Sequence, residues 1–254
     1  LKIVREKIGK IRQDTLTVGD QSLVEAITKS RWLRPFPKVR YTQSPDVVAA
    51  HLTEGKLVVF VDNSPTAIMI PTCIFDFLQD TDDYYFPIAT GNYFRILRML
   101  NMIAVIFLTP GYLLMAEGDI PTHPRLEFFF PDEGYSMPLF VQFLLLELAI
   151  DGLKLASLNT PSALGTSLSV VGALILGQFA VDSGWFIPQT ILCMAVLALA
   201  GFTQPSIELG YAIKFMRMLI LVGAAALGVW GALAALVINF AVLAATKNVV
   251  GTSY

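Results

Sequence analysis

Long apolar runs fill most of the sequence after residue 98, and short polar breaks separate them. Hydrophobic residues make up 55% of the 254 residues and charged residues only 15%, and the mean hydropathy is +0.63. This composition is too apolar for an ordinary soluble domain of that length. The sequence therefore predicts a mainly α-helical, polytopic membrane protein.

The charged residues are concentrated at the other end of the chain. Most of the 18 Lys and Arg residues lie before residue 99. We therefore predict a small cytoplasmic α/β domain over 1–92, expected to be incomplete, and a transmembrane domain over 93–254. Within the first domain the residue patterns predict helices and a β-hairpin. The helices are expected over 2–13, 21–34 and 45–52, and the strands over 56–62 and 66–71.

Five membrane spans are predicted from the apolar runs. Their approximate bounds are 93–116, 137–158, 164–181, 185–202 and 215–246. The last run would be about 48 Å long as one helix, which is more than one span needs. The run forms a tilted helix, a kinked helix or a hairpin that turns near Gly228–Gly231. The sequence does not decide among these, so the side of the membrane on which Tyr254 lies is not predicted.

The positive charges beside the first span predict its direction. Arg95 and Arg98 precede it, whereas the loop 117–136 after it carries several carboxylates and only Arg125. Lys and Arg are enriched on the cytoplasmic side of membrane proteins. We therefore expect the N-terminal domain to be cytoplasmic and the loop to be external. Arg95 and Arg98 are predicted to be interfacial anchors, with contacts to anionic lipid as the alternative.

Three charged residues interrupt the second predicted span. Glu147, Asp151 and Lys154 are spaced i, i+4 and i+7, which places them within an arc of about 60° on one helix face. Charged groups inside a bilayer are costly and tend to be functional. The face either lines a water-filled path that draws cations or forms a buried ionic cluster in which Lys154 pairs with the carboxylates. In a symmetric oligomer both interpretations hold at once.

Other polar and small residues are candidates for structural roles. Asn159 and Pro161 are expected to stop the second span, because proline disfavours a continuing helix. A stripe of small residues is expected to let helices pack closely. It comprises Gly165, Ser169, Gly172, Ala173 and Gly177. The polar residues Asp182, Gln204 and Glu208 are either vestibule groups or solvated loop residues.

Enzymatic motifs are missing from the sequence. There is no glycine-rich phosphate loop, no zinc-type spacing and no Gly-x-Ser-x-Gly nucleophile motif. His51 and His123 are predicted on opposite sides of the membrane and are each expected to be surface residues. We expect no enzymatic activity, no cofactor and no metal site. The net charge of -2 indicates no nucleic-acid partner.

Several linked motifs occur in order along the chain. The early ones are Glu54–Pro65, Ile70–Pro71, Asp82–Tyr85 and Tyr93–Arg98, and the later ones are Asp151–Pro161, Ser169–Leu174 and Phe202–Tyr211. The early motifs resemble the A-subunit family of bacterial spore germinant receptors. The later motifs are most similar to its stage V sporulation protein AF branch.

This resemblance implies a place and a role. It implies a protein of the spore inner membrane that acts in germination and is a homo-oligomeric channel, or a channel-associated subunit, for monovalent cations. The implied partners are membrane lipid and other spore germination membrane proteins. A non-conducting scaffold is the alternative, and a secondary transporter, suggested only by the break at Gln204-Pro205, is a third hypothesis.

Overall fold

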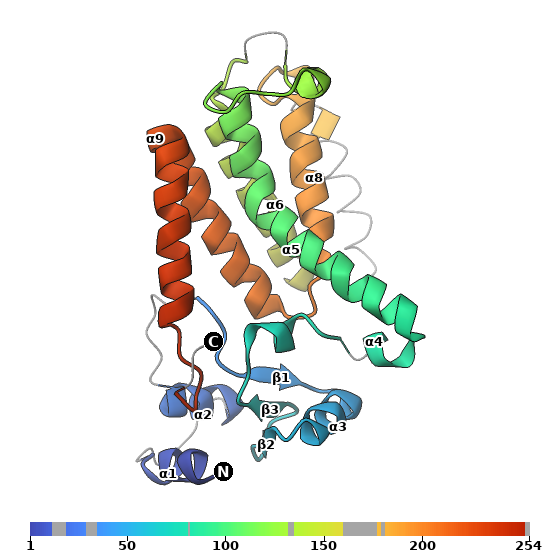
Figure 1. Cartoon of the computed structure of the whole chain (residues 1–254), viewed down its shortest axis with the longest axis vertical. Helices are drawn as coiled ribbons and strands as arrows, with labels where there is room; N and C mark the ends of the chain where they lie inside the picture. The colour runs from blue at the N-terminus through green and yellow to red at the C-terminus, as the bar shows by residue number, and fades with distance from the viewer. Residues whose placement is uncertain are drawn as a thin grey trace. The chain divides into compact units, whose positions relative to one another are not determined.

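The computed structural model describes residues 1–11, 19–28, 35–80, 82–131, 135–159, 177–178 and 181–251, and most of them are helical (Figure 1). Contacts between residues divide the chain into two compact units. The first comprises Leu1–Leu100, Gln204–Phe215 and Val237–Tyr254, and the second comprises Asn101–Thr203 and Met216–Leu236. Each unit therefore combines segments that are far apart in the sequence.

The first unit contains a small α/β domain. Its elements are α1 (Lys2–Gly9), α2 (Gly19–Thr28), β1 (Arg40–Thr42), α3 (Pro45–Thr53), β2 (Leu57–Phe60) and β3 (Ala67–Ile70). The strands form an antiparallel sheet in the order β1-β3-β2. The hairpin of β2 and β3 confirms the predicted pair of strands, and Asn63 adopts the left-handed conformation in its turn, with φ of 58°.

The C-terminal end of the described chain contributes to the core of this domain. Val249 is buried with Leu23 and Val24 of α2 and with Ile68 of β3. The Lys7 Nζ atom of α1 donates a hydrogen bond to the Val249 carbonyl oxygen at 2.6 Å. The segment after the last helix therefore returns to the N-terminal domain.

The remaining elements are mainly long apolar helices. They are η1 (Ile74–Phe77), α4 (Asp82–Tyr85), α5 (Ile88–Ala116), η2 (Pro124–Phe129), α6 (Leu139–Asn159), α8 (Pro188–Phe202) and α9 (Ile207–Ala245). Among the described helices, α5 and α9 are long and apolar enough to cross a membrane. Helix α8 has only 15 residues and spans about 22 Å. The predicted number of five spans is therefore not supported, and the predicted span 164–181 lies almost wholly outside the described residues.

Helix α9 is a hairpin of two helical arms. Leu227 and Gly228 leave the helical conformation, and Gly228 has φ of 59° and ψ of -141°, a region that only glycine adopts readily. The arms 207–226 and 229–245 approach closely, because a Cβ atom on Gly223 would lie 2.5 Å from the Gly231 carbonyl oxygen. The sequence left a tilted helix, a kinked helix and a hairpin open, and the structure has the hairpin.

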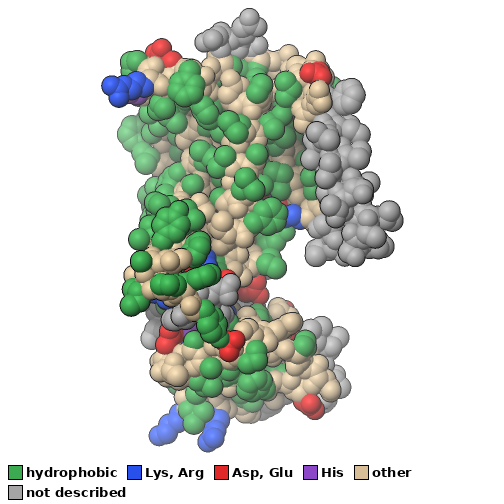
Figure 2. Space-filling view, turned by 90° about the vertical axis from the view of Figure 1, so that its right-hand side faces the viewer, with side chains coloured by type: hydrophobic (Ala, Val, Ile, Leu, Met, Phe, Trp, Pro, Cys, Tyr) green, Lys and Arg blue, Asp and Glu red, His purple; other side chains and the backbone are tan. Residues whose placement is uncertain are grey.

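Large apolar side chains lie on the outer surface of the helices. Figure 2 shows hydrophobic side chains over much of the helical surface with few charged groups among them. Leu148, Leu199 and Phe202 are all exposed, and Trp230 is 80% exposed. A soluble monomer seldom exposes so continuous an apolar surface. This surface suits helices that face lipid or neighbouring subunits.

Candidate functional site

The charged face of α6 meets an arginine from α9. Arg217 lies in the first arm of the hairpin, and its Nη2 atom donates a hydrogen bond to the Glu147 Oε2 atom at 2.6 Å. The two side chains are only 5% and 11% exposed. Asp151, one turn after Glu147, also interacts electrostatically with Arg217. The site is therefore a buried ionic cluster that joins two helices.

Lys154 continues the same face of α6 toward a third helix. Its Nζ atom lies 5.6 Å from the centre of the Phe202 ring at the end of α8, a distance typical of a cation–π contact. We call Glu147, Asp151 and Lys154 of α6, together with Arg217 of α9, the ionic cluster. It holds two cationic side chains and two carboxylates, so its formal charges sum to zero.

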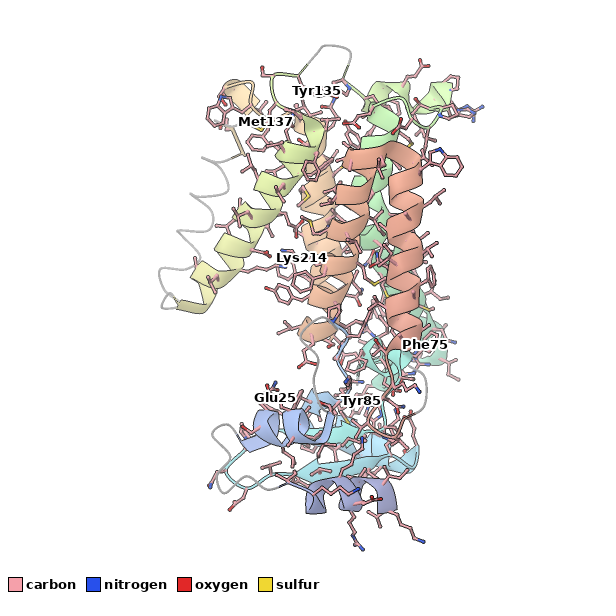
Figure 3. The ribbon with its side chains drawn as sticks, turned by 90° about the vertical axis from the view of Figure 1, so that its left-hand side faces the viewer. Glu25, Phe75, Tyr85, Tyr135, Met137 and Lys214 are labelled. Carbon is pink, nitrogen blue, oxygen red and sulfur yellow. The ribbon has the colours of Figure 1, made fainter. Side chains whose placement is uncertain are left out.

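Arg217 was not among the candidate site residues of the sequence analysis, and neither was Lys214, which lies one turn before it on α9. The two residues differ in the structure. The Nζ atom of Lys214, labelled in Figure 3, lies 5.9 Å from the centre of the Tyr211 ring on the same helix, whereas Arg217 is buried against Glu147 of α6. Arg217 already lies inside the apolar run that begins at Phe215. A lone arginine within an apolar run was the signal that would have pointed to a buried partner.

A second polar contact joins α6 to α8. Gln142 is fully buried, and its amide nitrogen donates to the Met137 carbonyl oxygen at 2.8 Å. Met137, labelled in Figure 3, lies just before α6. Its Oε1 atom accepts from the Ile187 backbone nitrogen at 3.1 Å and from the Thr190 hydroxyl at 2.9 Å. Satisfied polar contacts of this kind hold apolar helices in a fixed register. Gln142 therefore fixes α6 against α8. It lies a little more than one helical turn before Glu147, the first residue of the charged face.

The predicted helix stop and packing stripe are mostly outside the described part of the chain. Helix α6 ends at Asn159. The other predicted positions, Pro161, Gly165, Ser169, Gly172 and Ala173, lie outside the described residues. Gly177 is described, and a Cβ atom placed on it would meet no described atom within 4 Å. Close packing at this stripe therefore stays a prediction.

The three predicted vestibule residues have different surroundings in the structure. Asp182 is exposed after the undescribed segment. Gln204 donates from its amide nitrogen to the Arg98 carbonyl oxygen at 3.3 Å. Glu208 lies in the first turn of α9, where it lines an open groove of about 380 Å³ together with Tyr41 and residues of α2. The carboxylates of Glu208, Asp20 and Glu25 add to the effect of burial in raising the pKa of the Tyr41 hydroxyl.

The two predicted interfacial arginines both approach a buried carboxylate. Arg98 makes an ion pair with Asp83, whose side chain is fully buried, and donates to the Leu78 carbonyl oxygen at 3.3 Å. The Arg95 Nε atom lies 3.9 Å from the same carboxylate. Arg98 is thus held by contacts within the chain in the first half of α5, while Arg95 is half-exposed. Their role as interfacial anchors stays a prediction.

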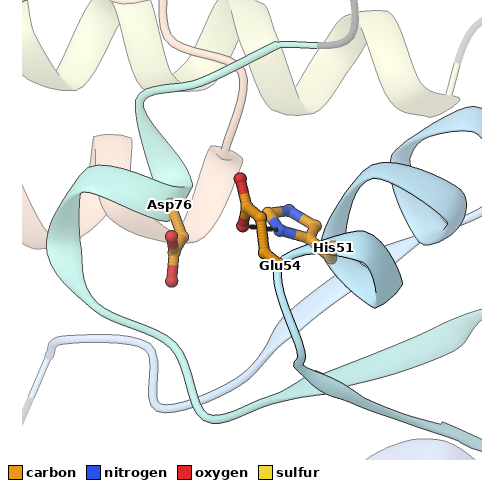
Figure 4. A group of neighbouring side chains, drawn as sticks. All are labelled: His51, Glu54 and Asp76. Carbon is orange, nitrogen blue, oxygen red and sulfur yellow. Dashed lines mark hydrogen bonds and ion pairs between the residues drawn. The ribbon is translucent and has the colours of Figure 1, made fainter.

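His51 is buried, so the prediction that it lies on the surface is wrong. It is only 4% exposed at the end of α3, and its Nδ1 atom contacts Glu54 (Figure 4). The same atom also contacts Lys56, and the Nε2 atom contacts Arg40. The distances are 3.0 Å, 3.0 Å and 3.2 Å. Burial lowers the pKa of His51, and the charges of Lys56 and Arg40 lower it further. His51 is therefore neutral at pH 7.

The ligand atoms of His51, Glu54 and Asp76 lie within 4.8 Å of one another, which is close enough to share a metal ion (Figure 4). The Lys56 ammonium, however, already contacts all three. It lies 2.6 Å from Asp76, 2.9 Å from Glu54 and 3.0 Å from the His51 ring. A lysine that neutralises the ligands occupies the place a metal ion would need, so the cluster is an ion-pair network of the domain.

The whole chain, residues 1–254, matches the family described as Bacillus/Clostridium GerA spore germination protein. The chain belongs to this family. The resemblance inferred from the linked motifs is thereby confirmed. The buried charges on α6 and α9 thus belong to a member of this family.

Three relatives illustrate the similarity. The chain is 34% identical to stage V sporulation protein AF of Bacillus subtilis (strain 168) over 96% of its own length and 48% of that protein. It is 29% identical to spore germination protein KA of the same organism, over 98% of its length and 46% of the relative. It is 27% identical to the uncharacterized membrane protein YfkQ, over 89% and 44%. The chain spans about half the length of these relatives, and no solved structure matches it.

Proposed function

We propose that this protein is a membrane subunit in spore germination that forms, or belongs to, an oligomeric channel for monovalent cations in the spore inner membrane. The observation that carries the proposal is the pair of carboxylates, Glu147 and Asp151, on the charged face of the largely apolar α6, which also carries Lys154. Carboxylates that line a narrow water-filled path favour cations over anions. Other spore germination proteins and lipid are its proposed partners, and no enzymatic step is proposed.

The α9 hairpin supports a topology with both ends on one side of the membrane. The two arms cross in opposite directions, and Val249 returns to the core of the N-terminal domain. Because Val249 packs in the core of the N-terminal domain, we infer that the segment around it lies on the same side of the membrane as that domain. The Lys and Arg distribution favours the cytoplasmic side.

Single cysteines at Asn63, Glu127 and Gly251, each in a protein without Cys73 and Cys193, test this topology. We expect an impermeant thiol reagent, added to intact cells, to label Glu127→Cys but neither Asn63→Cys nor Gly251→Cys. Permeabilised cells are the control, because there all three thiols should react. External labelling at residue 63 would reverse the orientation, and labelling at residue 251 alone would show that the hairpin does not return.

The Asp151→Asn substitution tests the cation path. We expect it to lower the cation-to-anion flux ratio of the reconstituted protein by about fivefold or more, because one charge about 4 Å from an ion contributes at least about 1 kcal/mol. Oligomer size should not change. The measurement is flux of matched salts from liposomes.

Asp46→Asn, which neutralises an exposed carboxylate in the N-terminal domain, is the matched control and should leave the flux ratio at the wild-type value. If Asp151→Asn and Asp46→Asn behave alike, α6 does not line the path. The buried Glu147–Arg217 pair would then favour the second candidate function, a non-conducting scaffold, because a neutral ion pair can simply hold helices together.

A further inference from the structure

The carboxylate of Glu147 already holds a cation, the guanidinium of Arg217, at 2.6 Å. The contact is largely shielded from solvent, since neither side chain is more than 11% exposed. A monovalent cation that moves along the charged face of α6 would bind the same carboxylate oxygen atoms of Glu147. In a site of low dielectric the two cations compete for one carboxylate, because binding both would leave an uncompensated positive charge.

The balance of charges in the cluster has the same consequence. With Arg217 in place, the charges of Glu147 and Asp151 are matched by those of Arg217 and Lys154, so the face has little attraction for a further cation. When Arg217 leaves, the same face carries a net negative charge. The presence or absence of one side chain thus changes α6 from a neutral face into one that attracts cations.

The supporting contacts place this change between α6 and α9. Gln142 ties α6 to the start of α8 through two hydrogen bonds, from the Ile187 backbone nitrogen and the Thr190 hydroxyl, whereas Arg217 reaches α6 from the first arm of the α9 hairpin. A shift of α9 by a few ångströms would break the Glu147–Arg217 contact without disturbing the contacts of Gln142. Small shifts of packed helices are a common form of switching in proteins.

We propose that Arg217 is a tethered counter-ion that closes the cation path, and that conduction requires its separation from Glu147. This inference rests on the proposed function, since it concerns the regulation of the same site. It differs from a purely structural salt bridge in its consequences. A structural pair only stabilises the protein, whereas a tethered counter-ion also sets the resting permeability.

The test is the resting flux of a monovalent cation from liposomes that contain the purified Arg217→Gln protein. We expect a resting flux about tenfold or more above wild type, with preference for cations retained. Lys214→Gln is the matched control, because it removes a positive charge one turn earlier on the same helix and should leave the resting flux unchanged. An assembled Arg217→Gln protein with wild-type resting flux overturns the proposal.

Two further variants separate closure from stability. Glu147→Gln combined with Arg217→Gln leaves Asp151 and Lys154 balanced and should return the resting flux to the wild-type level. Arg217→Ala should leak, and free guanidinium should block this leak at concentrations at which tetramethylammonium does not. A leak that guanidinium fails to block overturns the proposal.

If Arg217→Gln and Arg217→Ala do not assemble, Arg217→Lys is the deciding variant. Its shorter side chain should raise the resting flux, and an unchanged resting flux overturns the proposal.

The outcome also separates this inference from the proposed function. If Asp151→Asn changes ion selectivity but Arg217→Gln leaves the resting flux unchanged, α6 lines a cation path and Arg217 does not close it. If wild type and every variant fail to conduct, including variants with normal oligomer size, both the channel and its closure by Arg217 are wrong.

Discussion

Replacing Gly231 with leucine should prevent the α9 hairpin from closing and should destabilise the protein by about 3 kcal/mol or more. Even a Cβ atom on Gly231 would lie 2.8 Å from the Gly223 carbonyl carbon and 2.9 Å from the Leu227 side chain, and leucine adds three further carbon atoms. Overpacking of a tight contact usually costs about 1–3 kcal/mol and sometimes more, because the backbone must move. Thermal unfolding in detergent, with oligomer yield as a second readout, measures the effect.

An alanine pair provides the control for this prediction. Gly231→Ala should destabilise, whereas Gly111→Ala in α5 should be neutral or stabilising, because a Cβ atom on Gly111 meets no described atom within 4 Å. Alanine at an open helical position normally stabilises a helix by about 0.5–1 kcal/mol relative to glycine. The same chemical change is therefore expected to have opposite signs at the two sites. Equal effects would show that the arms of α9 do not approach at Gly223 and Gly231.

The sequence predicted those elements whose formation depends on residues close together in the chain. The β2–β3 hairpin was predictable because β-branched residues flank the turn residues Asn63-Ser64-Pro65. Strand β1 was not predicted, since three residues carry no periodicity and the strand is defined by its pairing with β3. For α9 the sequence left a hairpin open among three possibilities. The decision depends on Gly228 together with the contact of Gly223 and Gly231 across the turn, which no local pattern reveals.

The candidate site shows the same division. The shared face of Glu147, Asp151 and Lys154 follows from helical spacing and was predictable. The pairing of Glu147 with Arg217 joins residues 70 positions apart, so it could be found only in three dimensions. His51 was missed for a similar reason. Its burial depends on partners from β1 and η1, and its own helix gave no sign of them.

Lys56→Met should destabilise the N-terminal domain by about 3 kcal/mol or more. Lys56 lies among Glu54, Asp76 and His51, and its side chain is 14% exposed while that of Asp76 is 9% exposed. Burial opposes the charged form of Lys56, but hydrogen bonds to Asp76 and Glu54 prevail and raise its pKa. Removing one partner of a nearly buried ion pair leaves the other charge uncompensated, which typically costs about 3–5 kcal/mol. Hydrogen exchange of the β3 amides should accelerate by about a hundredfold or more.

Two variants show whether the loss comes from the uncompensated charge. Lys10→Met makes the same chemical change in an exposed pair with Glu6 and should cost at most about 0.5 kcal/mol. Lys56→Met combined with Asp76→Asn removes the remaining charge while keeping an oxygen that can accept from the Cys73 backbone nitrogen, so part of the lost stability should return. If the β3 amides of the Lys56→Met protein exchange at the wild-type rate, the Lys56 ammonium does not neutralise the carboxylates of Glu54 and Asp76. The ligand groups of His51, Glu54 and Asp76 are then available to a metal ion.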